Sequence, residues 1–136
     1  IRYPAAPINV QSGLDNRTVG LRVPDSGRES RRVENRVPGA DANPYLAIAA
    51  SLACGLLGMQ QKLDPSAPVT ASAYDMPYEL PRSLEQSLEA LEHCDDLKEM
   101  LGTRFVQAWN AVKESEYDTF LQVISSWERE HLLLNV

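Results

Sequence analysis

Cysteine is scarce in this sequence, and long apolar runs are missing. The two cysteines, Cys54 and Cys94, are too few for a disulfide framework and do not form a metal-binding motif. Cys54 lies in an apolar run, so we expect it to be a small buried side chain. No stretch of about 20 apolar residues could span a bilayer, and no signal peptide is recognisable. We therefore expect a cytoplasmic protein with no membrane partner.

An excess of positive charge is also missing, which limits the kinds of partner. The formal net charge is −6, and residues 45–136 hold fourteen acidic and six basic side chains. Nucleic-acid binding needs a basic face, so we expect no nucleic-acid partner. The acidic part is typical of a solvated helix surface. Positive charge gathers in residues 1–44, which hold seven arginines and five acidic residues.

The chain is short, and it has few histidines. Its 136 residues are about the length of one domain. The sequence begins at Ile1 without a methionine, and we expect it to be a piece of a larger protein. His93 and His131 lie apart from other metal-ligand types, so each is expected to be a surface or capping residue.

Two strands are predicted near the start of the chain. Residues 1–11 contain prolines and are expected to be irregular. Residues 16–23 and 31–37 are rich in strand-forming residues, and each run ends at a proline. The short polar loop between them predicts an antiparallel pair.

Helices are predicted from residue 43 onward. Asn43 suits the N-cap and Pro44 the first position of a helix that runs to about Lys62. That helix is so apolar that we expect it to be buried on most sides. A long loop should follow, from Asp64 to Pro81.

Further helices are predicted after Pro81, because the remaining 55 residues contain no proline. Ser83 and Gln86 suit a capping box, and Gly102 suits the end of a helix over residues 95–101. Thr103 is expected to cap the last long helix. Its apolar stripe should lie in the core or at a subunit contact, and it comprises Phe105, Trp109, Val112, Phe120, Ile124 and Trp127. The fold class is therefore α+β, with a short antiparallel strand pair followed by a helical majority.

The most informative feature is the charge pattern of the second predicted strand. Side chains alternate between the faces of a strand, so Arg32, Glu34 and Arg36 should share one face. Such a face suits polyphosphate, a carboxylate and a metal. On spacing alone, however, Arg17 and Arg22 could be ordinary surface residues. Glu34 could equally be the centre of a simple row of ion pairs.

Three motifs in this region occur in a fixed order. They read Asn16-Arg17-Thr18 through Arg22-Val23-Pro24, then Arg31-Arg32-Val33-Glu34-Asn35-Arg36, then Asp41-Ala42-Asn43-Pro44-Tyr45-Leu46. Their order and spacing resemble the C-terminal part of the catalytic domain of the glutamine synthetase family, from about Tyr3 to the end of the chain. Residues 73–91 and 101–120 resemble the γ-glutamylpolyamine (γ-glutamylputrescine) synthetase branch more than the ammonia-using enzymes.

The resemblance implies an ATP-dependent ligase that needs Mg²⁺ or Mn²⁺. Such enzymes activate the glutamate γ-carboxylate as a γ-glutamyl phosphate, which an amine or ammonia then attacks. By position in the motifs, Arg17 would contact the transferring phosphate and Arg36 the acyl phosphate or substrate carboxylate. Arg22 and Arg32 would lie on the nucleotide side, and Glu34 would bind the metal. Guanidinium groups suit this task because they stay ionised and donate in a planar fork.

The resemblance also implies how the piece relates to its parent. Residues 1–42 would be a strand and loop segment of the active site, and residues 43–136 a helical segment. The remaining metal ligands would lie upstream, so the piece alone should be inactive, whereas the parent would form a homo-oligomeric ring. Glutamine synthetase proper and a non-catalytic structural relative remain alternatives. Tyr74 lies where some bacterial members carry an adenylylated tyrosine, but its neighbours differ, and a tyrosine packed on its loop is favoured.

Overall fold

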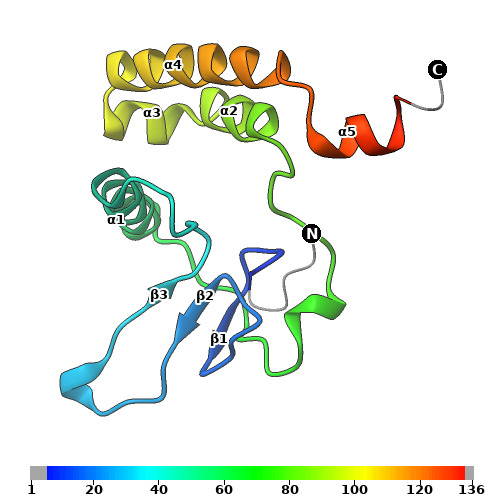
Figure 1. Cartoon of the computed structure of the whole chain (residues 1–136). Helices are drawn as coiled ribbons and strands as arrows, with labels where there is room; N and C mark the ends of the chain where they lie inside the picture. The colour runs from blue at the N-terminus through cyan, green and yellow to red at the C-terminus, as the bar shows by residue number, and fades with distance from the viewer. Residues whose placement is uncertain (1–5, 134–136) are drawn as a thin grey trace. The chain divides into compact units, whose positions relative to one another are not determined.

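The computed structural model describes residues 6–133, which form two compact units. One unit extends to Pro81 and the other begins at Arg82. The first contains a small sheet and one long helix, and the second contains helices alone (Figure 1). Helices make up the majority of the regular structure, so the predicted α+β class is confirmed. No helix of the described residues is long and apolar enough to cross a membrane.

The sheet of the first unit has three short strands in the order β1-β2-β3. They are β1 (Ser12–Leu14), β2 (Leu21–Val23) and β3 (Glu34–Asn35). β2 and β3 are antiparallel, with Arg22 opposite Glu34, which confirms the predicted pair. Both strands are shorter than predicted. β1 was not predicted at all, and it runs parallel to β2.

The predicted first strand is shorter because its beginning forms a turn. Asp15 has a positive φ of 45°, and the Asn16 side chain accepts a hydrogen bond from the amide of Thr18 at 2.9 Å. An asparagine that bonds to the main chain two residues later stabilises a turn against an extended strand. Residues 15–20 therefore connect two parallel strands over an unusually short path.

The helix of the first unit, α1 (Pro44–Gln60), begins as predicted. The side chain of Asn43 accepts hydrogen bonds from the amides of Tyr45 and Leu46 at the helix N-terminus. Its expected burial is wrong within this chain, since Leu52 is 69% exposed and Cys54 is exposed too. Strands of two or three residues offer too little apolar surface to cover a helix of 17 residues.

The loop that follows α1 returns to the sheet. It contains one turn of 3-10 helix, η2 (Ala73–Asp75), and a second such turn, η1 (Arg28–Ser30), lies between β2 and β3. The Val69 amide donates to the carbonyl of Ser12 at 2.8 Å, alongside β1. Val19 and Ala73 are fully buried, and the buried amide of Asn9 donates to the carbonyl of Ala73 at 2.9 Å. The core of this unit therefore lies between the sheet and the returning loop.

Residues 82–133, the described part of the second unit, contain four helices. They are α2 (Leu84–Glu92), α3 (Asp95–Leu101), α4 (Thr103–Leu121) and α5 (Ser126–His131). α2 and α3 pack against α4, where Leu88 and Val106 are buried (Figure 1). Lys98 donates to Asp95 at 3.1 Å, and this hydrogen bond raises the pKa of Lys98. Gly102 ends α3 with a φ of +94°, as its predicted place at a helix end requires.

Three details of this unit differ from prediction. The Ser83 hydroxyl accepts from the Gln86 amide, but the Gln86 side chain accepts from Arg82 and not from Ser83. Thr103 is the first helical residue and makes no side-chain cap, because Gly102 occupies the N-cap. The long helix ends at Leu121, so Trp127 belongs to α5.

The apolar stripe of α4 and α5 is less buried than a core stripe would be. Phe120 is 67% exposed and Trp127 is 59% exposed. The sequence predicted that this stripe lies either in the core or at a subunit contact. Within this chain, the core position is wrong for Phe120 and Trp127. The histidines do cap main-chain groups: the Nδ1 atoms of His93 and His131 lie 2.8 and 3.0 Å from the carbonyl oxygens of Glu89 and Trp127.

Candidate functional site

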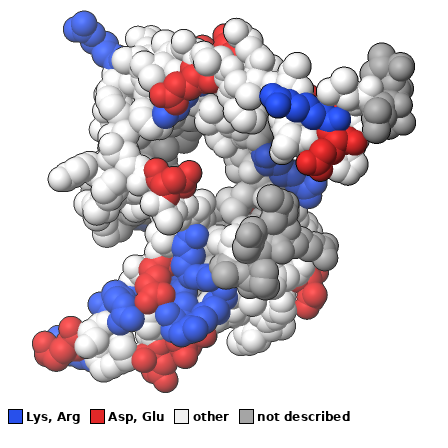
Figure 2. All heavy atoms as spheres, in the orientation of Figure 1, with Lys and Arg blue, Asp and Glu red and all other residues white. Residues whose placement is uncertain are grey.

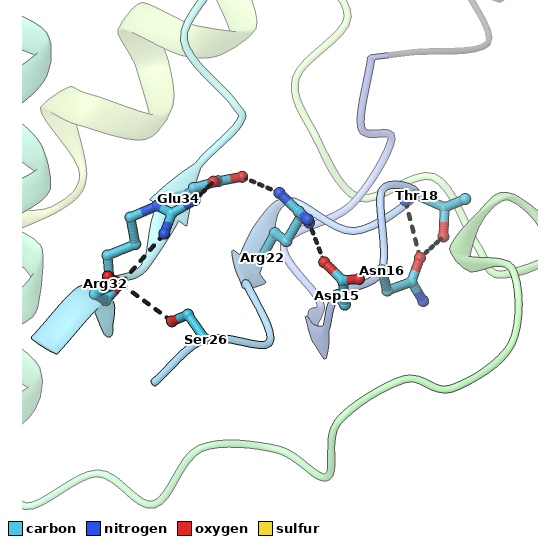
Figure 3. Close-up of polar contacts among 8 residues, drawn as sticks. Asp15, Asn16, Thr18, Arg22, Ser26, Arg32 and Glu34 are labelled. Atoms are coloured by element: carbon cyan, nitrogen blue, oxygen red, sulfur yellow. Dashed lines mark hydrogen bonds and ion pairs between the residues drawn. The ribbon is translucent and has the colours of Figure 1, made fainter. Parts of the chain in front are cut away.

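A row of charged side chains lies across the sheet of the first unit. The antiparallel register places Arg22 opposite Glu34, and Arg22 Nη1 donates to Glu34 Oε2 at 2.7 Å (Figure 3). Arg32 Nη2 donates to the other carboxylate oxygen of Glu34 at 3.1 Å. Arg22 Nη2 also bonds to Asp15, just after β1. Two guanidiniums and two carboxylates thus alternate along one chain of contacts, which we call the charged row.

The charged row holds each of its central groups in the ionised form. The hydrogen bond from Arg22 lowers the pKa of Glu34 from its ordinary value, with a smaller contribution from Arg32. The hydrogen bonds to Glu34 and Asp15 in turn raise the pKa of Arg22. The side chain of Arg22 is only 14% exposed, whereas that of Arg32 is 53% exposed. Arg32 is therefore the more accessible guanidinium of the row.

The predicted metal ligand Glu34 is engaged by arginine on both of its oxygens. A divalent cation needs several oxygen ligands, and it would compete with two guanidiniums for this carboxylate. Among residues 6–133 there is no group of three or more His, Cys, Asp or Glu side chains that could hold a metal ion. The residues present therefore do not fit a complete divalent-metal site.

Arg36 and Arg17 meet beside the charged row. Arg36 Nη1 donates to the carbonyl of Val19 at 3.0 Å and to the carbonyl of Arg17. The Arg36 amide also donates to the carbonyl of Gly20 at 2.8 Å. Arg36 therefore supports the main chain of the turn that carries Arg17. Arg17 itself is exposed at the tip of this turn.

The five predicted site residues thus belong to one region. Arg22, Arg32 and Glu34 form one contact chain, while Arg36 touches the main chain at Arg17. In the space-filling view, blue and red side chains intermingle over the part of the molecule that contains the sheet (Figure 2). Tyr74 lies on η2 in the same unit and is half-buried.

Two residues next to Arg17 have contacts that the sequence reasoning did not predict. The side chains of Asn16 and Thr18 bond to each other (Figure 3). Both also bond to the loop around η2. The sequence motif contains Asn16 but does not indicate these contacts. An asparagine in a short connection is a known signal for a turn, because its side chain can bond the main chain two residues later.

A shallow groove of about 470 Å³ also lies in the first unit. It runs between the segment after β3 and the first half of α1, and Asn35 there donates to Ser51 at 2.9 Å. Its walls are mainly apolar and include Pro38, Ala42, Pro44, Ala47, Ile48 and Leu52. None of the charged groups described above lines it.

The chain is similar to known proteins in family, sequence and structure. The family model for the catalytic domain of glutamine synthetase matches residues 2–132. Type-1 glutamine synthetase 2 of Dictyostelium discoideum is 40% identical over 134 residues, which cover 94% of this chain and 26% of that protein. Glutamate–isopropylamine ligase of Pseudomonas sp is also 40% identical, over 88% of this chain and 27% of that protein.

Solved structures agree with these matches. GmaS without ligand superposes with a TM-score of 0.81 at 34% identity, covering 95% of this chain and 31% of that chain. A complex of GmaS with ADP gives a TM-score of 0.84 at 32% identity, covering 98% and 33%. The chain thus spans about a quarter to a third of the length of the relatives it matches. The chain belongs to the glutamine synthetase family.

Proposed function

We propose that this chain is the C-terminal portion of the catalytic domain of an ATP-dependent γ-glutamyl ligase. The ligase would join the γ-carboxylate of glutamate to an amine through a γ-glutamyl phosphate. The observation that carries the proposal is the arginine cluster on one small sheet, with Arg17 exposed beside the charged row. Relatives named as a glutamate–isopropylamine ligase and a γ-glutamylethanolamide synthetase support an amine as the acceptor.

The reaction has two displacements. ATP supplies the phosphoryl group: a γ-carboxylate oxygen of glutamate bonds to the γ-phosphorus, and ADP leaves. The amine nitrogen then bonds to the carbonyl carbon of the γ-glutamyl phosphate, inorganic phosphate leaves from that carbon, and the nitrogen loses a proton. Charge on the transferring oxygens must be matched by fixed donors, and guanidinium groups provide them without a change of protonation.

The arginines would divide this work according to their accessibility. Arg17 is exposed on a turn whose main chain is held by Arg36, so it suits the transferring phosphoryl group. Arg32 is half exposed and suits the nucleotide phosphates. Arg22 is committed to Asp15 and Glu34, so its contribution to the nucleotide side would be mainly through the field of the charged row. Arg36 donates to the main chain of the turn, and we propose that it also faces the acyl phosphate or substrate carboxylate.

Glu34 remains our candidate for a Mg²⁺ or Mn²⁺ ligand of the whole ligase. It supplies one carboxylate, and the described residues do not complete a site around it. We therefore assign no reaction step to a metal here, and we expect the 136-residue chain alone to be inactive. ATP-dependent γ-glutamyl transfer by the isolated chain would contradict this expectation.

The test is an ATP-consumption assay on the full-length ligase with glutamate, Mg²⁺ and one acceptor at a time. The acceptors are ammonia, putrescine, isopropylamine and ethanolamine. Arg17→Ala should lower kcat by about 10²–10³-fold, the usual effect of removing one donor to a developing charge. Glu34→Ala should also abolish most activity. Arg28→Ala is the matched control, because Arg28 is an exposed arginine of the same unit outside the cluster.

Each outcome separates the proposal from its alternatives. Turnover with an organic amine that is lost in Arg17→Ala and kept in Arg28→Ala supports the amine ligase. Turnover with ammonia alone favours glutamine synthetase proper, which the Dictyostelium relative also represents. A folded full-length protein without turnover on any acceptor would indicate a non-catalytic relative.

We also propose that the full-length ligase is a cytoplasmic homo-oligomeric ring. The support is the exposed apolar surface of α1 and of the stripe on α4 and α5, part of which a neighbouring subunit would cover. Light scattering on the purified full-length protein tests this directly, and a monomer at micromolar concentration would contradict it.

A further inference from the structure

The turn that carries Arg17 is too short to be held by the sheet alone. It connects Leu14, the last residue of β1, to Leu21, the first residue of β2, and these strands are parallel. Parallel neighbours usually need a crossover of about a dozen residues or more, so a connection as short as residues 15–20 must be fixed by other contacts. The side chains of Asn16 and Thr18 supply those contacts.

Asn16 uses every hydrogen-bonding position of its side-chain amide. Its Nδ2 atom donates to the carbonyls of Val69 at 3.0 Å and Ala71 at 2.8 Å. Its Oδ1 atom accepts from the amide of Thr18 at 2.9 Å and from the hydroxyl of Thr18 at 2.7 Å. An amide has two donor hydrogens and two acceptor lone pairs, and all four are satisfied here. A flipped amide would oppose oxygen to two carbonyl oxygens, so the orientation is fixed.

Thr18 completes a second link to the same loop. Its hydroxyl donates to Asn16 and accepts from the amide of Ala73 at 2.8 Å. Ala73 is fully buried and begins η2, so its amide is a fixed point of the first unit. The residues on either side of Arg17 are therefore tied to the segment 69–73, more than 50 positions away in the sequence.

Arg17 lies between these two anchors, with its main chain fixed and its side chain exposed. The carbonyl of Arg17 also accepts from the guanidinium of Arg36. A long side chain directed from an immobile main-chain position loses less entropy when it meets a charged group. The hydrogen bonds of Asn16 thus fix the position of its neighbour Arg17. The Asn16 side chain itself has no donor or acceptor left for a ligand.

We propose that Asn16 and Thr18 are positioning residues for Arg17, and that the segment 69–73 holds the phosphate-directed arginine through them. The inference rests on the proposed function, because it takes the transferring phosphoryl group as the target of Arg17.

The test uses the full-length ligase and a double-mutant cycle. Asn16→Asp keeps the acceptor atoms for Thr18 but removes both donors to the loop. It should lower kcat by about tenfold or more, since small misplacements of a catalytic group are costly. The affinity for ADP, which lacks the transferring group, should change less than twofold in calorimetry. In Arg17→Ala, adding Asn16→Asp should lower kcat no further, because Asn16 acts through Arg17.

Controls separate positioning from general stability. Gln11→Ala removes another side-chain link to the same loop, the contact of Gln11 with Glu79 at 3.4 Å, without touching the turn. It should leave kcat within twofold. Thr18→Val removes the hydroxyl at constant shape and should lower kcat, whereas Thr18→Ser should restore it. If Asn16→Asp does not yield folded protein, Thr18→Val and Thr18→Ser can be combined with Arg17→Ala in the same double-mutant cycle.

The outcomes distinguish the inference from the function beneath it. Full activity of Arg17→Ala would overturn the proposed role of Arg17, and the inference with it. A loss in Arg17→Ala that adds to the loss in Asn16→Asp would overturn the inference alone. Equal losses in Gln11→Ala and Asn16→Asp, or a parallel fall in ADP affinity, would also show that Asn16 is only a structural residue.

Discussion

Replacement of Gly20 by alanine should disturb the sheet at the site more than its single added methyl group suggests. Gly20 is the last residue of the turn that carries Arg17, directly before strand β2, which carries Arg22. A Cβ atom at Gly20 would lie 2.6 Å from the carbonyl oxygen of Asn9. That is about 0.8 Å inside the 3.4 Å at which ordinary van der Waals contact begins. This oxygen belongs to the main chain of Asn9, which is fully buried, so it cannot move aside as the end of a flexible side chain could.

The magnitude follows from two opposing effects. Inserting an atom into a well-packed place typically costs about 1–3 kcal/mol. Alanine also lowers the conformational entropy of the unfolded chain, which stabilises the folded state by about 0.4–1 kcal/mol. We therefore expect a net loss of about 1–2 kcal/mol, a factor of about 5–30 in the local opening equilibrium. The peptide hydrogen bond from Arg36 to Gly20 should open with the strand.

Hydrogen exchange measured by mass spectrometry is the suitable assay. Both tryptophans, Trp109 and Trp127, lie in the second unit, so tryptophan fluorescence would not report on the sheet. Amides of residues 18–37 in the full-length protein should exchange about 5–30-fold faster in Gly20→Ala than in the wild type.

Two other glycines give matched controls for the same substitution. A methyl group added at Gly27 would meet no atom within 4 Å, and Gly27 lies outside the strands, so Gly27→Ala should leave exchange in the sheet unchanged. Gly55 is equally open but lies inside α1, so Gly55→Ala should stabilise that helix by about 0.5–1 kcal/mol. Unchanged or slower exchange in Gly20→Ala would refute the close contact with Asn9.

Three further predictions concern the charged row and the second unit. The hydrogen bond from Arg22 lowers the pKa of Glu34 from an ordinary value of 4.5, so the pair stabilises the fold above that pH and loses its effect as the pH falls through the lowered pKa. The melting temperatures of wild type and Glu34→Gln should therefore differ at pH 7 and converge as the pH falls below the lowered pKa of Glu34. Leu88→Ala should destabilise the buried contact of α2 with α4 by about 2–5 kcal/mol in urea unfolding followed by tryptophan fluorescence, with Leu84→Ala, a more exposed leucine, costing clearly less. Ser125→Ala removes a capping box and should weaken α5 by about 1 kcal/mol, seen as faster amide exchange over residues 126–131 with no change in the sheet.

Local signals in the sequence predicted the start of α1 and the end of α3, but not the end of α4. Asn43 followed by Pro44 is sufficient to start α1, because the cap and the fixed proline φ act within three residues. Gly102 is similarly sufficient to end α3. Thr103 shows the limit of such reasoning, since two neighbouring residues both suit a helix boundary and the geometry of Gly102 decides which is used.

The strands were harder to predict because they depend on partners far away in the sequence. Residues 12–14 read Ser-Gly-Leu and have no strand signal of their own. They form a strand because β2 pairs with them and because the Val69 amide donates to the carbonyl of Ser12. The alternation of Arg32 and Glu34 was visible in the sequence, and the two side chains do meet. The contact between Glu34 and Arg22 depends on the register between β2 and β3. Local sequence patterns do not predict that register.

Burial was the least predictable property. The composition of α1 indicates that it needs a cover, but not which surface provides one. In this chain the sheet and the returning loop cover little of it, and Leu52 stays exposed. A chain that spans a quarter to a third of its relatives' length would be expected to leave such faces open.

The small core has a consequence for how the site keeps its shape. Few apolar side chains of the first unit are buried, and the largest of them that is fully buried is Val19. The positions of Arg17 and Arg22 therefore depend on polar contacts: the charged row on one side, and the bonds of Asn16 and Thr18 to segment 69–73 on the other. Hydrogen bonds fix direction more sharply than apolar contacts do, but each is lost outright when one partner is removed. Changes in the loop around η2 should therefore alter the arginines before they unfold the unit, so activity should be more sensitive to this loop than stability is.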